Sequence, residues 1–164
     1  MEDAVFDPLS LDSQLCFPLY ACAREVIRRY QPLLERLGLT YTQYITMMVL
    51  WEKKCQRVKD LGEKLYLDSG TLTPLLKKLE ARGLIARRRD PSDERSLLVT
   101  LTPAGEALRA EALPIPQQIG ACISFPPEDA AALYTLLYRL LNSLNGNAPG
   151  EAGTEFQAPD RSPL

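Results

Sequence analysis

The 164-residue sequence contains no histidine. Histidine is the side chain that most often acts as a general base, and it is a common zinc ligand, so its absence disfavours most hydrolase mechanisms and typical zinc sites. The sequence also lacks any run of about 18 apolar residues, and residues 1–7 are acidic where a secretory signal would be basic and then apolar. These absences predict a cytoplasmic protein that uses neither a metal nor an organic cofactor.

The chain has only four cysteines, and no two of them form a Cys-x-x-Cys pair. They are Cys16, Cys22, Cys55 and Cys122. In a reducing compartment cysteines do not normally form structural disulfides, and an isolated cysteine is usually a small buried apolar residue. A chemical role for any of the four therefore has to rest on further features of the sequence.

Charge is unevenly distributed along the chain. The net charge is −2, yet residues 52–95 contain twelve basic and eight acidic residues, so this segment carries +4 and the remainder carries −6. A basic middle between acidic ends is typical of a DNA-binding module, although a solvated charged face gives the same count. Charge alone leaves both interpretations open.

Apolar residues at helical spacing predict two long helices in the first third of the chain. The first is expected from about Ser13 to Gly38, with Pro18 about a turn inside it. The second, capped by Thr40 or Thr42, is apolar nearly all round. It is therefore expected to be the buried centre of the fold.

Two short amphipathic helices are predicted next, over residues 58–65 and 71–80, with Pro74 in the first turn of the latter. A tight turn separates them, which makes the pair a helix-turn-helix candidate. After Gly83 the spacing of the apolar residues is no longer helical. Residues 84–89 and 96–101 predict two strands, and the turn-forming residues 90–95 between them predict a β-hairpin.

The last third of the sequence predicts more helix and then a tail. A helix starts at Pro103 and is interrupted at residues 113–116, and residues 127–144 form a helix too apolar to lie alone on a surface. From residue 145 onward glycine and proline recur and large apolar residues are scarce, which predicts disorder. The expected organisation is one domain over residues 1–144 and a disordered tail over residues 145–164.

Three segments of the sequence resemble the MarR family of transcriptional regulators, and within it the organic-hydroperoxide-sensing branch. They are LDSQLCF at residues 11–17, LGLTYTQY at residues 37–44 and LDSGTLTPLLKKLE at residues 67–80. The wider family pattern is matched by DER at residues 93–95 and LTPAG at residues 101–105. The resemblance covers residues 11–144.

This resemblance implies a mainly helical winged helix-turn-helix with a small β-hairpin wing and with N- and C-terminal helices that form a homodimer. It implies a repressor that binds a palindromic operator in double-stranded DNA while Cys16 is reduced and dissociates when an organic hydroperoxide oxidises that residue. In this family the second short helix enters the major groove and an arginine-tipped wing enters the minor groove.

The start of the second short helix carries small polar residues that suit contact with DNA. Ser69, Gly70, Thr71 and Thr73 stand where free backbone N–H groups and small hydroxyls can approach phosphates and base edges, and Lys77 follows one turn later. Helix capping is an alternative role for Ser69 and Thr71, and the two roles can coexist.

On the wing, Arg95 is the candidate for the minor groove. Its long cation suits a narrow groove of negative potential, and Asp93 is expected to hold it in place. An ordinary surface charge is the alternative interpretation of Arg95.

The resemblance also implies that tyrosines of the other subunit, at the positions of Tyr30 and Tyr41, donate hydrogen bonds to the Cys16 thiolate. Within one subunit, Tyr30 follows Cys16 by fourteen residues on a single helix, which is roughly 21 Å along its axis, so these two cannot touch. Phenolic O–H donors would stabilise the reactive thiolate, and an apolar pocket would favour organic peroxides. Both tyrosines are ordinary core residues in the alternative interpretation.

Cys122 stands near the position where some members of this branch carry a second, resolving cysteine. Cys22 lies about 9 Å along the helix from Cys16, beyond disulfide reach, and Cys55 has no role in the family pattern. Pro18, close to Cys16, departs from that pattern.

Two other functions stay open at this stage. One is a MarR-type regulator of a different ligand or oxidant, in which Cys16 is merely buried. The other is a thiol peroxidase, which shares the sulfenic-acid chemistry; this is weakened by the absence of a cationic partner near Cys16 and by a helix-turn-helix without a purpose.

Overall fold

The structure is a computed structural model that describes residues 7–123 and 125–146. The chain divides into two compact units, Met1–Leu113 and Pro114–Leu164. Most of the predicted tail, residues 147–164, lies outside the described residues. Among the described helices, none combines the length and the apolar character needed to cross a membrane.

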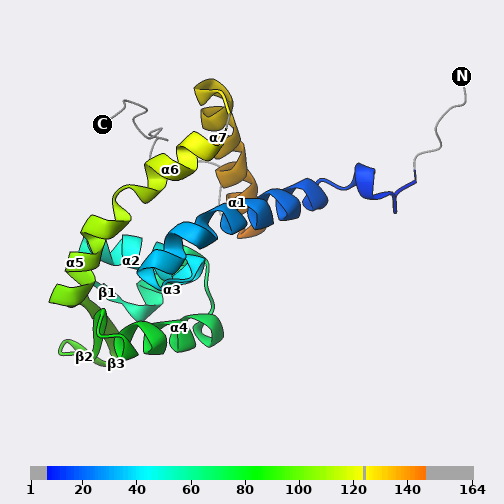
Figure 1. The fold of residues 1–164 in the computed structure, drawn as a ribbon. Helices are drawn as coiled ribbons and strands as arrows, with labels where there is room; N and C mark the ends of the chain where they lie inside the picture. Colours follow the sequence, from blue (N-terminus) through cyan, green and yellow to red (C-terminus); the bar gives the residue numbers. More distant parts are fainter. Residues whose placement is uncertain (1–6, 124, 147–164) are drawn as a thin grey trace, which may run out of the picture. The chain divides into compact units, whose positions relative to one another are not determined.

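The first unit contains five α-helices and a small sheet within its described part (Figure 1). Its elements are a 3-10 helix (Leu11–Ser13), α1 (Cys16–Leu37), α2 (Tyr41–Lys53), β1 (Cys55–Arg57), α3 (Val58–Leu65), α4 (Ser69–Ala81), β2 (Ile85–Asp90), β3 (Asp93–Leu101) and α5 (Pro103–Ala112). This is the predicted winged helix-turn-helix, with α3 and α4 as the helix pair and β2 and β3 as the wing.

The first long helix, α1, begins at Cys16, so the predicted start near Ser13 was wrong. Ser13 instead ends the preceding 3-10 helix. A start at Ser13 would place Pro18 where its missing N–H is needed for an intrahelical bond, whereas a start at Cys16 places it in the first turn, where N–H groups have no helical partner. Cys16 is therefore the first helical residue rather than one a turn inside the helix.

The second helix, α2, is the centre of the first unit, as predicted. Thr40 caps it through a reciprocal pair of hydrogen bonds, in which the Gln43 N–H donates to Thr40 Oγ1 and the Thr40 N–H donates to Gln43 Oε1. Met47 and Leu50 of this helix are fully buried. The other fully buried large apolar residues of the unit come from α3, α4 and the sheet, and they are Leu61, Leu72, Leu76, Leu79, Ile85 and Val99.

The sheet is antiparallel with the strand order β1-β3-β2. The sequence did not predict β1, because three residues are too short to show an alternation of apolar and polar side chains. The wing turn is also tighter than expected. Asp90 pairs with Asp93, so only two residues form the turn, and the other residues expected there belong to the strands.

Two local features fix the turn between α3 and α4: a close backbone contact at Gly62 and an N-terminal cap on α4. A Cβ atom on Gly62 of α3 would lie 2.9 Å from the Leu67 carbonyl oxygen, so only glycine lets the turn pass this close. Asp68 then caps α4 by accepting the Thr71 N–H. Because α4 starts at Ser69, Pro74 lies in its second turn and not in the first turn as predicted.

The second unit contains α6 (Ile115–Cys122) and α7 (Pro127–Leu144) within its described part. The predicted interruption after α5 and the predicted last helix are both confirmed. Cys122 is the last residue of α6, which is a helix separate from the one that begins at Pro103. Apolar side chains of α7 remain exposed in the single chain, namely Leu133, Leu136, Leu137 and Leu144.

Candidate DNA-binding surface and cysteine sensor

The recognition helix α4 has one buried and one exposed face. Its leucines, Leu72, Leu75, Leu76 and Leu79, point into the core of the first unit. The five residues expected to contact DNA are all exposed, and they are Ser69, Gly70, Thr71, Thr73 and Lys77. The structure thus places these five residues where a duplex can reach them.

Thr71 has a second role at the start of this helix. Its N–H donates to Asp68 Oδ1 at 2.9 Å and its hydroxyl donates to Asp68 Oδ2 at 3.0 Å. These hydrogen bonds hold the pKa of the Asp68 carboxyl below its usual value. The Thr71 oxygen can still accept a hydrogen bond, so capping and DNA contact are compatible at this residue.

On the wing, Asp93 holds the backbone at Arg95 and not its guanidinium. Asp93 Oδ1 accepts the Arg95 N–H at 3.1 Å, and Oδ2 accepts the Ser96 hydroxyl at 2.7 Å. The Ser96 bond, with that of Arg95, lowers the pKa of Asp93. The Arg95 side chain itself is exposed, and the hydrogen bond to Asp93 holds the backbone from which it projects.

A buried carboxylate that the sequence analysis did not single out braces the wing. Asp90 is only 5% exposed, and its Oδ2 accepts Arg57 Nε and Nη2, both at 2.9 Å. Its Oδ1 accepts the Ser92 hydroxyl and N–H, and the Ser92 bonds are the main cause of a lowered Asp90 pKa. Arg57 ends β1 and precedes α3, so this ion pair ties the wing turn to the start of the helix-turn-helix.

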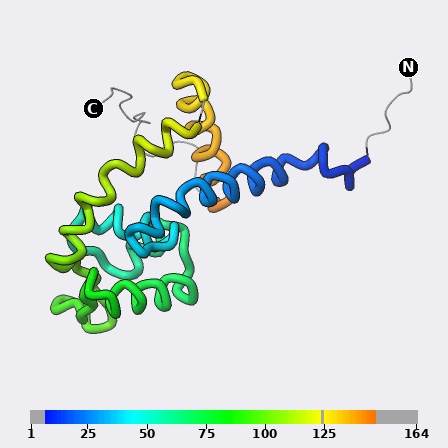
Figure 2. The backbone as a smooth tube through the Cα atoms, in the orientation of Figure 1, coloured from blue at the N-terminus to red at the C-terminus, as the bar shows by residue number. Residues whose placement is uncertain are grey.

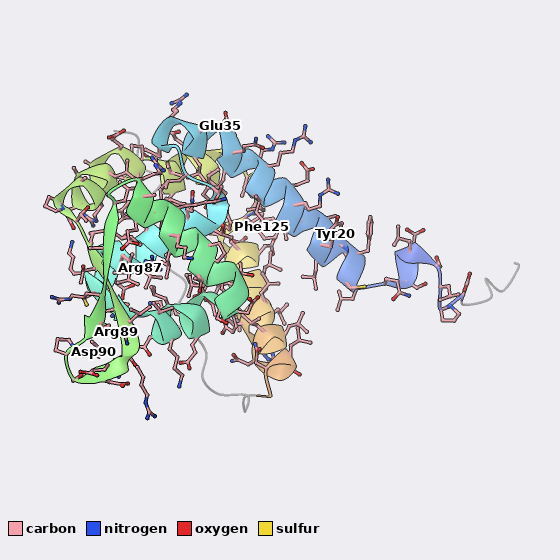
Figure 3. All side chains as sticks on the ribbon, turned by 90° about the horizontal axis from the view of Figure 1, so that it is seen from below. Tyr20, Glu35, Arg87, Arg89, Asp90 and Phe125 are labelled. Carbon is pink, nitrogen blue, oxygen red and sulfur yellow. The ribbon has the colours of Figure 1, made fainter. Side chains whose placement is uncertain are left out.

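A second ion pair ties the wing to the recognition helix. Glu80 of α4 accepts three bonds from Arg87 of β2, from its backbone N–H at 3.0 Å, from Nε at 2.9 Å and from Nη2 at 2.6 Å. The side-chain bond of Arg87 is the main cause of a lowered Glu80 pKa. Figure 3 shows Arg87 beside α4, with Arg89 and Asp90 further along the wing. This ion pair therefore fixes the position of the wing relative to the recognition helix α4, the two elements expected to contact DNA.

Cys16 lies exposed at the first residue of α1. In Figure 2 the N-terminal half of this helix extends away from α2 to α5 and the sheet. Tyr30 is on the same continuous helix, about 21 Å further along its axis. The tyrosines of a subunit are therefore out of reach of its own Cys16.

The structure brings Tyr30 and Tyr41 together and adds Tyr44 to them. The ring centroids of Tyr30 and Tyr41 are 5.0 Å apart, and those of Tyr30 and Tyr44 are 5.9 Å apart. In the sequence, Tyr44 stands out only as part of the apolar run of the second helix. Its spacing of three residues from Tyr41 on α2 was the available signal for a shared face.

Burial keeps these phenols protonated. Desolvation, with smaller contributions from Tyr41 and Tyr44, raises the pKa of Tyr30 to about 12. Burial also raises the pKa of Tyr41 and of Tyr44. At neutral pH all three groups thus keep the O–H that donation to an anion requires.

The remaining cysteines occupy three different settings. Cys22 is exposed on α1, Cys55 is half-buried in β1, and Cys122 is exposed at the end of α6. The structure thus leaves Cys16, Cys22 and Cys122 open to solvent, and only Cys55 is partly covered.

Comparison with known proteins identifies the family. A model of the family described as "Transcriptional regulator SarA/Rot" matches residues 28–111, just over half of the chain. The organic hydroperoxide resistance transcriptional regulator of Bacillus subtilis is 48% identical over 140 residues, which are 85% of this chain and 95% of that protein. This chain is a member of the MarR family of transcriptional regulators, in the organic hydroperoxide branch.

Solved structures of the regulator AbfR of Staphylococcus epidermidis have the same fold. Reduced AbfR bound to DNA matches with a TM-score of 0.70 and 35% identity, covering 82% of this chain and 93% of that one. Disulfide-formed AbfR matches with a TM-score of 0.59 and 36% identity, covering 80% and 92% of the two chains. The predicted family and fold class are therefore confirmed.

For this MarR-family chain, Arg95→Ala is expected to weaken operator binding by about 1–3 kcal/mol, the usual cost of losing a specific arginine contact in a groove. Asp93 continues to hold the wing backbone in this variant, so the loss is that of the exposed guanidinium. Fluorescence anisotropy with a labelled duplex measures the effect. Arg109→Ala, which removes an exposed arginine from α5, is the matched control. Equal affinities of the two variants would contradict the minor-groove role of Arg95.

Proposed function

We propose that the protein is a homodimeric repressor that binds a palindromic operator while Cys16 is reduced and leaves it when an organic hydroperoxide oxidises Cys16. The observation that carries this proposal is the placement of Cys16, exposed at the start of α1, together with the half-buried Tyr30–Tyr41 pair near the other end of that helix. The 48% identical relative is named for organic hydroperoxide resistance, which supports the same conclusion.

A dimer accounts for the apolar surface that the single chain exposes. Leu15 is 72% exposed, and Phe17, Val26 and Ile27 of α1 are also exposed. The leucines of α7 are exposed in the same way. Burial of apolar surface is the main driving force of association, so these two terminal helices are the proposed dimer interface.

A dimer also completes the sensor. The Tyr30–Tyr41 pair is out of reach of its own Cys16, so the phenols that hydrogen-bond the Cys16 thiolate come from the partner subunit. The half-buried rings of Tyr30 and Tyr41 supply an apolar wall that suits the carbon chain of an organic peroxide.

The sensing reaction is a two-electron oxidation of sulfur. The Cys16 thiolate attacks the terminal oxygen of the hydroperoxide, an S–O bond forms and the O–O bond breaks. The alkoxide that leaves takes up a proton and departs as an alcohol, while Cys16 remains as a sulfenic acid. The thiol of Cys122 in the partner subunit then attacks this sulfur, so that a disulfide forms and water leaves. The AbfR relative has been solved in a disulfide-formed state.

DNA recognition follows from two-fold symmetry. Each subunit presents the exposed face of α4 to the major groove and Arg95 to the neighbouring minor groove. Two such surfaces related by a two-fold axis match half-sites about 34–36 Å apart, one turn of the duplex.

A gel-shift titration tests the proposal. The probe is an inverted-repeat duplex from DNA flanking the protein's own gene, used before and after treatment with cumene hydroperoxide. The reduced protein is expected to bind this duplex more tightly than random DNA and to lose it after treatment. Equal binding to both duplexes would exclude the repressor, and steady peroxide consumption with a thiol reductant would instead indicate a thiol peroxidase.

Removing the phenol hydroxyls is expected to slow sensing without abolishing it. Tyr30→Phe and Tyr41→Phe each keep the ring contact but remove a hydrogen bond to the thiolate, so the reactive form is less populated. The rate of Cys16 oxidation, followed by thiol labelling, should fall in both variants. Tyr66→Phe, which removes an exposed hydroxyl at the end of α3, is the matched control and should oxidise at the wild-type rate. Unchanged rates in Tyr30→Phe and Tyr41→Phe would remove these tyrosines from the sensor.

A further inference from the structure

The C-terminal end of α1 is held by an arginine from the recognition helix. Arg82 is the C-cap residue of α4, and its Nη2 donates to the Leu37 carbonyl at 2.9 Å. Its Nη1 donates to the neighbouring carbonyl of Gly38. One guanidinium thus joins the last turn of the helix that starts with Cys16 to the last turn of the helix that faces DNA.

The contact suits the chemistry of a helix end. The last carbonyls of a helix have no intrahelical donor, and the C-terminal end of the helix dipole is negative, so a cation with two N–H donors satisfies both. Glycine suits position 38 because its φ of 62° is left-handed, a backbone conformation that other residues rarely adopt. A Cβ atom there would lie 2.9 Å from Arg82 Nη2, so a larger residue would also push the guanidinium aside.

The ends of α1 and α4 that Arg82 joins are both anchored by buried side chains. Leu34 and Leu37 of α1 are buried in the core of the first unit, and so is Leu79 of α4. Pro32 removes one backbone hydrogen bond of α1, yet the helix continues to Leu37. A rotation or shift of α1 therefore has to break the Arg82 bonds or pull on the end of α4.

The same turn of α4 is attached to the wing. Glu80, two residues before Arg82, accepts the three bonds from Arg87 of β2. Displacement of the end of α4 is thus shared with the wing through charge-assisted hydrogen bonds. Arg82 and Glu80 together make the end of the recognition helix the junction of the sensor helix and the wing.

We propose that Arg82 is a positioning residue that transmits oxidation of Cys16 from α1 to the DNA-binding elements. The inference rests on the proposed function, because it concerns the coupling between the oxidised sensor and DNA release. Arg82 touches neither the peroxide nor the reacting sulfur. It sets how much of the α1 displacement reaches α4.

The test compares two quantities in wild type and Arg82→Ala. The first is the ratio of operator affinities in the reduced and the peroxide-treated states, measured by anisotropy with the same inverted-repeat duplex. The second is the rate of Cys16 oxidation, measured by thiol labelling. Coupling between sites usually changes affinity by about 5- to 150-fold, so the ratio is expected to fall by about fivefold or more in Arg82→Ala, with the oxidation rate unchanged.

Controls separate coupling from simple stabilisation. A residue that only caps α1 would lower the melting temperature and weaken DNA binding in both redox states equally, which leaves the ratio unchanged. Arg36→Ala, an exposed arginine in the last turn of the same α1, is the matched control and should keep the wild-type ratio. Arg82→Lys retains the charge but cannot hold two carbonyls with a planar fork, so an intermediate ratio is expected.

The outcomes distinguish this inference from the proposed function. A wild-type protein that peroxide does not release from DNA would overturn both. Normal release of wild type, combined with an unchanged affinity ratio in Arg82→Ala, would overturn the role of Arg82 alone. If Arg82→Ala does not fold, the ratio in Arg82→Lys decides, and a wild-type value there overturns the inference.

Discussion

Cys16→Ser is expected to bind operator DNA like the wild type and to remain bound after treatment with organic hydroperoxide. Serine preserves the size and polarity of the exposed first residue of α1, so the fold and the distant recognition helix are undisturbed. Its hydroxyl cannot form a sulfenic acid, so the oxidation step has no acceptor of oxygen. Anisotropy with a labelled operator duplex, before and after one equivalent of cumene hydroperoxide, measures the difference.

The chain provides a matched control for this prediction. Cys22→Ser changes another exposed cysteine of the same helix, six residues further along, and is expected to respond to peroxide like the wild type. Cys55→Ser in β1 should also respond normally. Release of Cys16→Ser at the wild-type peroxide dose would show that Cys16 is not the sensor.

Peroxide treatment is expected to convert the wild-type protein into a covalent dimer on a non-reducing gel. The sulfenic acid of Cys16 condenses with the exposed thiol of Cys122 in the partner subunit, and the bridge requires the two Cα atoms within about 7 Å. Forming it locks the dimer in one arrangement of its terminal helices. The dimer band should be absent in Cys16→Ser and in Cys122→Ser and should disappear when a reductant is added.

Two results would contradict the two-cysteine reaction. One is a dimer band that persists in Cys122→Ser. The other is a wild-type protein that stays monomeric on the gel and forms a mixed disulfide with an added small thiol. Either result would leave Cys16 as a sensor that works without Cys122 as its resolving cysteine, so the reaction with Cys122 can fail while the sensing prediction stands.

Local patterns in the sequence were sufficient for most of the helices. The apolar run of α2 predicted a buried centre, and α7 was predicted with its bounds because proline, acidic residues and then a long leucine-rich stretch mark a helix clearly. The wing was predicted from the change of period after Gly83. In each case the signal and the structure belong to the same short segment.

Elements that depend on distant partners were missed. β1 exists because Cys55 and its two neighbours pair with residues 98–100 of β3. The wing turn is short because Asp90 is buried against Arg57, which lies 33 residues earlier. A solvent-exposed Asp90 would have been an ordinary turn residue, so the sequence pattern alone indicated a longer turn.

For the candidate site too, the sequence predicted individual residues, whereas the contacts between distant segments emerged only from the structure. The family motifs indicated Cys16, the tyrosine pair, the start of α4 and Arg95. They did not indicate that Asp93 accepts the backbone N–H of Arg95, or that Tyr44 joins the tyrosine cluster. They also did not indicate the contact of Arg82 with the end of α1.

The sequence by itself determined which segments are helical, which residue is the candidate sensor and which family the chain belongs to, because these depend on spacing and residue type within one segment. Tertiary structure decided the third strand, the extent of the wing turn, the tyrosine cluster, the hydrogen bonds of Arg82 to the end of α1 and the ion pair that joins α4 to the wing. These features are contacts between residues 7 to 45 positions apart, from Glu80 and Arg87 to Leu37 and Arg82, and they exist only after folding has placed the two segments side by side.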